Sequence, residues 1–369
     1  MVTYRAAVIG LGRMGSTFDD EVQRGGSLFL PYCHAPSYVA APEVELVAGA
    51  DPHPEQRRLF AERWGLGSSH LYEDYRAMLA AEQPDLVSVC TSAWHRATIL
   101  LDTIEAGVRG IWAEKPLTLS LAEADAVVAA GDRHGTVLAV NCARRWNPLF
   151  WEARRLAAGG ELGQVLQVTA LAQCNLSHNG SHAIDTIRFL ARGEVQWVFG
   201  EMESDAAAAG DGDLAGNGYL AFDNGVRAFL RSQATGAAQW EFDVVGTEGR
   251  VRCLANGVEW ELWKMLPGAP GGGRAAARLP YPWPARLEPM GLTIVRDIIG
   301  CIEQGGEPRS SAVDGRAALE VAIALRHSHR TGGCRVDLPL ADRSLRIESA
   351  EIAGDAEPAR LRRERAARG

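Results

Sequence analysis

The tripeptide Glu114-Lys115-Pro116 is the part of the sequence best suited to chemistry. The chain contains 38 lysine and arginine residues, yet only two of them, Lys115 and Lys264, are lysines. Lysine is a compact charge that can hydrogen-bond or protonate a reacting oxygen, a role for which the delocalised charge of arginine is less suited. Proline also biases the residue before it toward an extended conformation, as at a strand end. The alternative is an ordinary strand-end lysine paired with Glu114.

A glycine-rich segment near the N-terminus has the pattern that binds dinucleotides. It follows the apolar run Ala6–Ile9, which is typical of a buried parallel strand. In a G-x-G-x-x-G pattern the glycines allow a tight turn, close approach of a pyrophosphate to the backbone, and close packing of helix on strand. The residues predicted to contact the cofactor here are Gly10, Leu11, Gly12, Arg13, Met14 and Gly15.

Asp51 is the best candidate for the acid that binds the ribose hydroxyls. Such an acid is expected roughly 20 residues after the glycine pattern, but Asp51 follows Gly15 by 36 residues. The spacing is restored if residues 16–32 are an insert and the helix resumes near Cys33 and His34. The insert is either a lid near the cofactor or a surface excursion. Because a carboxylate would repel a 2′-phosphate, Asp51 favours NAD, with NADP not excluded.

The first half of the chain alternates between strand-like and helix-like segments, which predicts a doubly wound parallel sheet. Ligands bind such sheets at the carboxyl ends of the strands, where Thr91, Ser92, His95, Glu114 and Lys115 would fall. His95 either faces the nicotinamide or faces solvent at a helix N-terminus. The expected elements are strands over 44–51, 85–90, 108–113 and 136–141, and helices over 56–64, 74–81 and 120–134, the last opened by a capping box of Ser120 and Glu123.

The second half changes character, with many short strand-like runs that predict an antiparallel sheet. Two segments, 205–217 and 266–284, are expected to be loops. The expected strands cover 163–173, 196–204, 218–222, 226–233, 240–245, 250–254 and 258–263, and the helices cover 181–190, 289–304 and 314–331. We therefore expect a cofactor domain over 1–142, an α+β domain over 143–340, and a charged C-terminal tail over 341–369.

Composition narrows the classes of protein and partner. The chain has 369 residues, 47% of them hydrophobic and 23% charged, which suits a globular protein of two domains. A net charge of −8 argues against nucleic acid or a membrane surface as the main partner. Seven scattered cysteines without a Cys-x-x-Cys pair, together with the absence of a signal-peptide pattern, predict a cytoplasmic protein.

His178, His182 and Asp185 form a second group with chemical potential. On a helix starting early enough, their spacing would place them on one side of a turn. The same spacing is typical of a metal site. Asn179-Gly180 between the histidines favours a loop instead, so no metal is predicted.

Several segments in order along nearly the whole chain resemble the Gfo/Idh/MocA oxidoreductases, named for glucose–fructose oxidoreductase and inositol dehydrogenase. The resemblance implies a Rossmann domain followed by a domain with a large, mostly antiparallel open sheet, through which a homodimer or homotetramer forms. It also implies a nicotinamide cofactor and a sugar, cyclitol or related polyol as substrate. The matching segments are 10–15, 91–95, 114–116, Arg144-Arg145-Trp146-Asn147-Pro148, 180–185, 245–249 and 336–340.

The resemblance also implies roles for individual residues. In the family, the histidine that matches His182 works with the lysine that matches Lys115, and an aspartate commonly precedes the histidine by four residues. Here that position is His178. A carboxylate would stabilise a protonated His182, whereas a charged imidazole would disfavour it, so the proton relay can run differently.

The resulting expectation is an NAD-dependent oxidoreductase that moves hydride between nicotinamide and a secondary alcohol or ketone carbon. His182 would be the general base, Lys115 would bond the alkoxide or carbonyl oxygen, His178 would relay the proton, and Asp185 would orient His182.

Substrate contacts are expected from Lys115, Arg144, Trp146, His178 and His182, although an arginine pair beside a buried tryptophan is also a common surface pattern. Two functional alternatives stay open. The first is an elimination, lyase or glycosidase reaction with hidden redox, in which NAD is reduced and then reoxidised. The second is a cofactor-bound sensor without catalysis.

Overall fold

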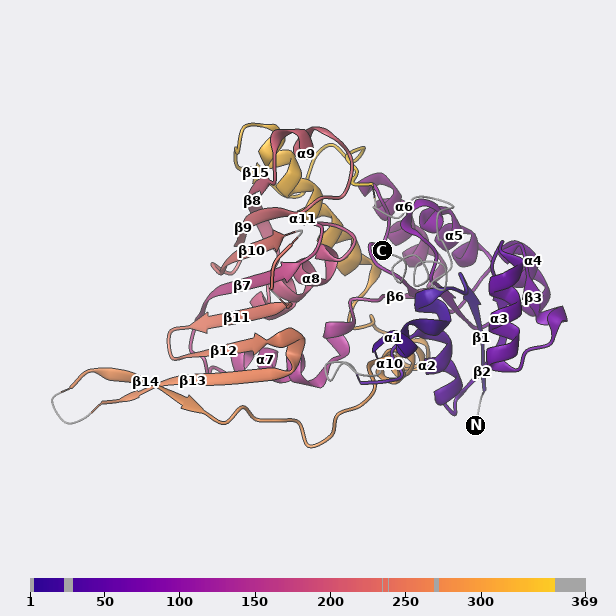
Figure 1. Cartoon of the computed structure of the whole chain (residues 1–369), viewed down its shortest axis with the longest axis horizontal. Coiled ribbons are helices and arrows are strands. Elements are labelled where there is room, and N and C mark those ends of the chain that lie inside the picture. Colours follow the sequence, from indigo (N-terminus) through magenta and orange to yellow (C-terminus); the bar gives the residue numbers. More distant parts are fainter. Residues whose placement is uncertain (1–2, 23–28, 234, 238, 269–271, 349–369) are drawn as a thin grey trace, which may run out of the picture. The chain divides into compact units, whose positions relative to one another are not determined.

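The computed structural model describes residues 3–22, 29–233, 235–237, 239–268 and 272–348. These fall into two compact units. The first comprises the described residues up to 143 together with 288–316, and the second comprises those of 144–287 with 317–348. Figure 1 shows both units, coloured along the chain.

The first unit contains a six-stranded parallel sheet in the order β3-β2-β1-β4-β5-β6. Every residue of β4 and β5 is buried, as expected for parallel strands covered on both faces. The strands are β1 (Tyr4–Ile9), β2 (Val44–Ala50), β3 (Leu71–Tyr72), β4 (Leu86–Val89), β5 (Gly110–Ala113) and β6 (Val137–Val140).

Local signals start and stop the helices of this unit. The predicted capping box is confirmed, since the Ser120 hydroxyl accepts from the Glu123 amide at 3.2 Å and the Glu123 carboxylate accepts from the Ser120 amide at 3.1 Å. The helices are α1 (Phe18–Val22), α2 (His34–Ala40), α3 (Pro54–Trp64), α4 (Tyr75–Glu82), α5 (Ala93–Glu105), α6 (Leu121–His134) and α10 (Met290–Gln304).

The predicted insert over 16–32 is tied together at its two ends. It includes α1, and the buried carboxylate of Asp19 accepts hydrogen bonds from the amides of Tyr32 and Cys33, the latter at 2.9 Å. The helix resumes at His34, close to the predicted position. Residues 23–28 of the insert lie outside the described residues, so the lid hypothesis stays a prediction.

The second unit contains a nine-stranded sheet in the order β14-β13-β12-β11-β7-β10-β9-β8-β15. All neighbouring pairs are antiparallel except β7 and β10. The predicted fold class is therefore confirmed. The strands are β7 (Val165–Gln173), β8 (Val195–Met202), β9 (Gly216–Phe222), β10 (Arg227–Gln233), β11 (Glu241–Gly246), β12 (Gly249–Leu254), β13 (Glu259–Pro267), β14 (Arg274–Leu279) and β15 (Val336–Asp337).

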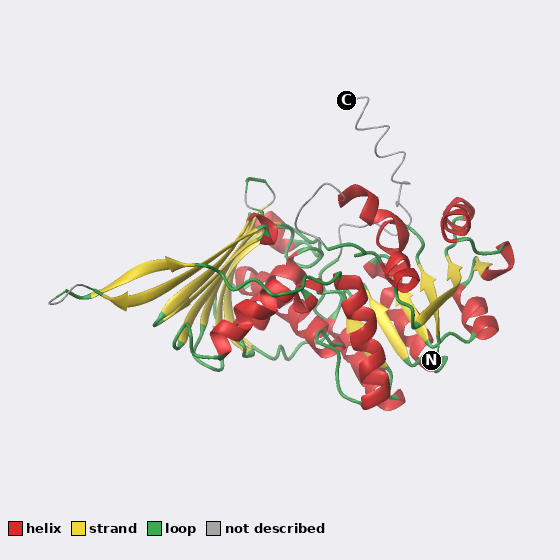
Figure 2. Cartoon of the chain, turned by 90° about the horizontal axis from the view of Figure 1, so that it is seen from below, coloured by secondary structure: helices red, strands yellow, loops and turns green. Residues whose placement is uncertain are grey.

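Helices cover one face of this sheet (Figure 2). In β10, Ala228 and Leu230 are buried, whereas Phe229 and Arg231, which alternate with them, are exposed. This alternation is typical of a sheet covered on one side. α8 packs on β7, β10 and β11. The helices are α7 (Pro148–Ala158), α8 (Gly180–Ala191), α9 (Asp205–Ala209) and α11 (Ala312–Arg330).

Two segments predicted as loops contain regular structure. The expectation for 266–284 was wrong, because β13 continues to Pro267 and β14 pairs with it. The alanines and arginines of β14 show no alternation of polarity, so only the pairing with β13 makes this segment a strand. The segment 205–217 begins with α9, which Ser204 caps. The tail predicted over 341–369 lies outside the described residues from 349 onward.

Candidate active site

Two glycines of the G-x-G-x-x-G pattern, Gly10 and Gly15, leave no room for a side chain, whereas Gly12 faces open space. Gly10 has a φ of +88°, and an added Cβ would lie 2.9 Å from the carbonyl carbon of Cys90. A Cβ on Gly15 would lie 2.2 Å from the carbonyl oxygen of Gly10. A Cβ on Gly12 would meet no atom within 4 Å, so open space lies above its backbone. The loop thus has the open backbone surface that a pyrophosphate needs.

Asp51 follows β2 and is held against this loop. Its Oδ2 accepts from the amide of Leu11 at 2.9 Å, and its Oδ1 accepts from the amide of His53 at 2.9 Å. The side chain of Arg57 fixes the same turn by donating to the Asp51 carbonyl oxygen at 2.6 Å. Asp51 therefore lies beside the glycine loop, as expected for a ribose-binding acid.

The turn after β4 carries the predicted residues Thr91, Ser92 and His95. Ser92 precedes α5, and His95 is exposed in its first turn. Among the described residues, the buried Oγ1 of Thr91 has no hydrogen-bond partner. Arg96, which is 2% exposed, donates to the carbonyl oxygens of Thr91 and Pro116. This buried arginine ties the turn after β4 to the Glu-Lys-Pro turn.

Glu114 and Lys115 directly follow β5, and both are buried. The Oε1 of Glu114 accepts from His34 Nε2 at 3.1 Å and from Asn141 Nδ2 at 2.6 Å, while its Oε2 accepts from the Lys115 amide at 3.2 Å. Burial raises the pKa of the Glu114 carboxyl, but the hydrogen bond and charge of His34, the charge of Lys115 and the bond from Asn141 outweigh it and hold this pKa below its usual range. Glu114 is therefore an ionised buried carboxylate.

The first unit fits a dinucleotide cofactor. Open space above Gly12, a carboxylate at the end of β2 and an unsatisfied hydroxyl on Thr91 all occur at carboxyl ends of strands. A buried polar atom without a protein partner is uncommon, and a bound ligand is one way to satisfy it. Asp51, Thr91 and the glycine loop would hold the cofactor.

In the second unit, α8 begins at Gly180, so Gly180 and Ser181 are helical and the loop predicted between the two histidines is limited to Asn179. His182 lies in the first turn of α8, whereas His178 lies in the turn before it. The buried carboxylate of Asp213 accepts from the amides of Ser177 at 2.8 Å and His178 at 2.5 Å. Asp213 thereby holds the chain where it enters α8.

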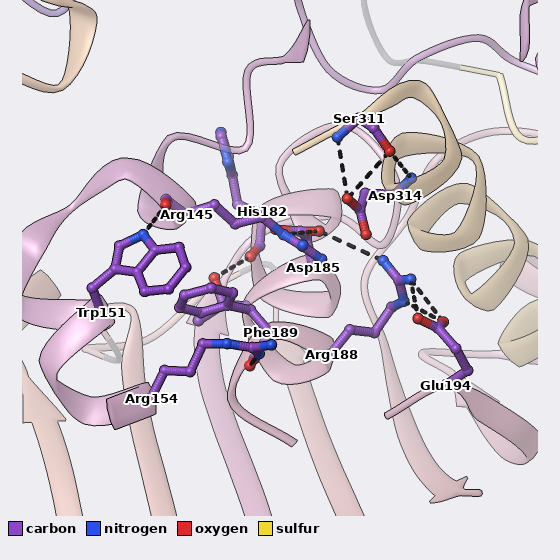
Figure 3. Close-up of polar contacts among 11 residues, drawn as sticks. Arg145, Trp151, Arg154, His182, Asp185, Arg188, Phe189, Glu194, Ser311 and Asp314 are labelled. Atoms are coloured by element: carbon purple, nitrogen blue, oxygen red, sulfur yellow. Dashed lines mark hydrogen bonds and ion pairs between the residues drawn. The ribbon is translucent and has the colours of Figure 1, made fainter. Parts of the chain in front are cut away.

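The carboxylate of Asp185 faces arginine side chains (Figure 3). Both of its oxygens lie 2.9 Å from Arg145 Nε, and Arg188 Nη1 lies 3.7 Å from Oδ1. In Figure 3 the side chain of His182 extends away from this carboxylate. Asp185 and Arg145 are thus brought together, while the predicted orientation of His182 by Asp185 stays a prediction.

Trp240 brings Arg144 and His182 to one aromatic side chain. The guanidinium of Arg144 lies 4.7 Å from the centre of the Trp240 ring, and the imidazole of His182 lies 6.1 Å from it at a steep angle. Arg144 also donates to Asn256 Oδ1 at 2.8 Å. Trp240 has a φ of +55°, which is uncommon for a bulky residue. Trp146 is buried, at 1% exposed.

In the described part of the chain, no group of three or more histidine, cysteine, aspartate or glutamate side chains is placed to hold a metal ion. None of the helices in the same residues is long and apolar enough to cross a membrane.

Comparison with known proteins connects both units to one family. Residues 4–142 match the model of an oxidoreductase family with an NAD-binding Rossmann fold, and residues 174–252 match the GFO/IDH/MocA C-terminal domain. The chain is 30% identical over 318 residues to a D-apiose dehydrogenase of Paraburkholderia graminis, covering 78% of this chain and 82% of that protein. The chain belongs to the Gfo/Idh/MocA family. The resemblance seen in the sequence and the predicted NAD-binding oxidoreductase class are confirmed.

Other members of the family resemble the chain over most of its length. It is 26% identical to the scyllo-inositol 2-dehydrogenase (NAD(+)) of Bacillus subtilis, covering 89% of this chain and 94% of that protein. Its fold matches the crystal structure of an inositol dehydrogenase homologue from Azotobacter vinelandii, complexed with NADH and myo-inositol, with a TM-score of 0.71. That pair is 18% identical and covers 91% of this chain and 98% of the other. Because the relatives are dehydrogenases, the sensor alternative lacks support.

Residues absent from the sequence prediction surround the family motifs. Apart from the bond between Arg96 and Thr91, their partners are distant in sequence, so no local spacing pointed to them. The only available signal was residue type, such as an arginine four residues after Ser92 or a tryptophan before a strand. These residues are His34, Arg96, Asn141, Asp213 and Trp240.

Proposed function

We propose that the protein transfers hydride between C4 of the nicotinamide of NAD and a secondary alcohol or ketone carbon of a sugar, cyclitol or related polyol. The observation that carries the proposal is a buried lysine beside an ionised carboxylate, at the same sheet edge as a glycine loop suited to a dinucleotide. The relatives named as D-apiose and scyllo-inositol dehydrogenases support the substrate class.

The residues of the chain would position the substrate and move the proton. Lys115 donates a hydrogen bond to the alkoxide or carbonyl oxygen of the substrate. His182 removes the proton of the substrate hydroxyl during oxidation. His178 tunes or relays that proton, and Asp185 fixes Arg145 through their ion pair. NAD, when bound, accepts or returns the hydride.

Cofactor and substrate contacts come from separate parts of the chain. We assign substrate contacts to Lys115, Arg144, Trp146, His178 and His182, and add Trp240 because it presents a ring face beside His182 and Arg144. We assign the substrate-binding domain to residues 143–340 and the cofactor domain to 1–142. The cofactor contacts are Gly10, Leu11, Gly12, Arg13, Met14, Gly15, Asp51, Thr91, Ser92, His95, Glu114 and Lys115.

The proposal is tested by recording the absorbance of reduced nicotinamide while the protein and NAD are mixed with each member of a panel of sugars, cyclitols and amino sugars. We expect a rise that stays, with one equivalent of NADH for each product. The proposal would be overturned if NADH binds but no compound of the panel changes the absorbance, and if the matching ketones and imines do not oxidise NADH either.

One observation favours a second candidate reaction, the elimination with hidden redox. His178 stands where the resemblance to the family implies an aspartate, and a charged imidazole there would disfavour a protonated His182. This reaction would give an absorbance that rises and falls back while product accumulates. NAD consumed in proportion to product would exclude it.

We also propose that the uncovered face of the large sheet binds a second copy of the chain, giving a dimer or tetramer. Phe199 and Phe229 are both 41% exposed, and Tyr219 lies between them in register across β8, β9 and β10. An exposed row of aromatic rings is typical of a protein interface.

The seven free cysteines support a cytoplasmic location.

A further inference from the structure

Among the described residues, three donors bond the carboxylate of Asp51 at the end of β2. Its Oδ2 accepts from the Leu11 amide at 2.9 Å. Its Oδ1 accepts from the His53 amide at 2.9 Å and lies 3.0 Å from His53 Nδ1. Because a carboxylate only accepts, the imidazole nitrogen carries the hydrogen of this third bond. His53 therefore makes two of the three bonds, and both go to the same oxygen.

With the described residues counted, Asp51 has one acceptor site left, on Oδ2. A carboxylate offers about four acceptor sites, two on each oxygen. His53 takes both sites of Oδ1, whereas the Leu11 amide takes one site of Oδ2. The adenosine ribose of NAD presents two neighbouring hydroxyls, and a carboxylate that bonds both most directly uses one site on each oxygen. The His53 imidazole thus takes the site that the second hydroxyl needs.

Of the three donors, the imidazole is the one that can move away. The other two are backbone amides. The backbone of Asp51 is itself fixed, since its amide donates to the Tyr72 carbonyl oxygen at 3.0 Å and its carbonyl oxygen accepts from Arg57 at 2.6 Å. The His53 side chain is 56% exposed and makes no capping bond to α3, which begins at the next residue. The imidazole can therefore turn into solvent while the start of α3 stays intact.

We infer that His53 is a specificity-determining residue of the cofactor site, whose imidazole competes with one hydroxyl of the adenosine ribose for Asp51. Binding of both hydroxyls requires the imidazole to leave, and the lost bond offsets part of the gain. NADP carries a phosphate in place of the 2′-hydroxyl, so the open site on Oδ2 suffices for its one remaining hydroxyl. The competition therefore weakens NAD and narrows its advantage over NADP. The inference rests on the proposed contact between Asp51 and the ribose.

Fluorescence titration of the full-length protein with NADH tests this competition without a substrate. In His53→Ala the second acceptor site is open, so we expect the Kd for NADH to fall by about two- to tenfold, the contribution of one hydrogen bond. An NADH analogue that contains 2′-deoxyadenosine has one hydroxyl at this place. Its Kd should be the same in wild type and in His53→Ala. The difference between the two ligands isolates the competition at Asp51 from other effects of the substitution.

Matched variants separate loss of the bond from loss of bulk. His53→Leu keeps a side chain of similar size without a donor, so it should show the same gain for NADH as His53→Ala. His70 is the control residue, because its exposed imidazole lies 2.8 Å from a carboxylate oxygen of Glu82, whose side chain is 8% exposed. His70→Ala should leave the Kd for NADH unchanged. The Kd for NADPH should not fall in His53→Ala, so the preference for NADH should rise.

A Kd for NADH that is unchanged or higher in folded His53→Ala would overturn the inference. An equal gain for the 2′-deoxy analogue would also overturn it. If His53→Ala does not fold, His53→Leu decides by the same two criteria.

Failure of the proposed ribose contact would look different. Asp51→Asn would then bind NADH as tightly as wild type. If Asp51→Asn weakens NADH binding while His53→Ala gives no gain, the contact stands and the competition is refuted. Failure of the proposed hydride transfer is a separate result, since these titrations contain no substrate.

Discussion

Glu114 and Lys115 place a buried carboxylate and a buried ammonium group side by side in the sequence. Taking two charged groups out of water costs roughly several kcal/mol of free energy for each ion. Hydrogen bonds and the attraction between the two charges offset this cost. His34 and Asn141 supply bonds to the carboxylate. Position 115 is a lysine in a chain whose basic residues are almost all arginines. The local arrangement is more suited to chemistry than to stability alone.

At the residue scale, we expect Lys115→Ala to lower kcat/KM by roughly 10²–10⁴-fold, the range of a positioned proton donor. NADH binding should persist, because the glycine loop and Asp51 are unchanged. Turnover on the identified substrate and fluorescence titration with NADH measure the two effects. Lys264→Ala is the matched control, since that lysine donates to the Glu161 carbonyl oxygen in the second unit. Turnover of Lys115→Ala close to wild type would contradict the assigned role.

At the element scale, the start of α8 depends on the loop between β8 and β9. Asp213 and Leu214 accept four hydrogen bonds from residues 175–178, at 2.5 to 3.1 Å. α11 fixes the same loop, since Arg330 donates to the carbonyl oxygen of Gly210 at 2.7 Å and lies 3.0 Å from Asp211. The Asp213 carboxylate thus holds the backbone of residues 177 and 178, just before α8.

Asp213→Asn should disturb this start, because an amide can accept only through its single oxygen and turns an N–H₂ group toward the other backbone amide. We expect the free energy of unfolding to fall by about 1–3 kcal/mol, the cost of an unsatisfied buried group. The turnover number should fall, with NADH affinity unchanged. Denaturant unfolding and NADH titration measure these effects. Asp223→Asn, at an exposed turn after β9, is the control. Wild-type stability and turnover in Asp213→Asn would exclude the clamp.

At the scale of the whole molecule, the large sheet has one covered and one uncovered face. The uncovered face is aromatic over β8, β9 and β10. Over β11 to β13 it carries paired charges, among them Arg252 with Glu261 at 3.2 Å and Arg250 with Asp243. A monomer would leave the aromatic rings in water, whereas a second copy would remove them from it.

We expect the double variant Phe199→Asp and Phe229→Asp to dissociate the oligomer into monomers, because both carboxylates would lie in the contact. Light scattering coupled to size exclusion measures the mass. Leu59→Asp, at a residue 44% exposed on α3 of the first unit, is the matched control and should leave the mass unchanged. An oligomer that survives the double variant would place the contact elsewhere.

The sequence by itself determined the features that depend on neighbours along the chain. The glycine pattern, the capping box at Ser120 and the alternation of strands with helices are local, so residue type and spacing predict them. Asp51 could be predicted as the ribose-binding acid despite the insert over 16–32, because the carboxyl ends of parallel strands meet at one edge of the sheet.

Only the tertiary structure decided which side chains support the candidate catalytic residues. His34 bonds Glu114 across 80 residues, and Asp213 bonds the His178 amide across 35. Arg144 and His182 meet at Trp240 from different elements. β14 became a strand only through pairing with β13. Such contacts depend on packing between distant segments, and a local pattern carries no information about the distance between two residues in space.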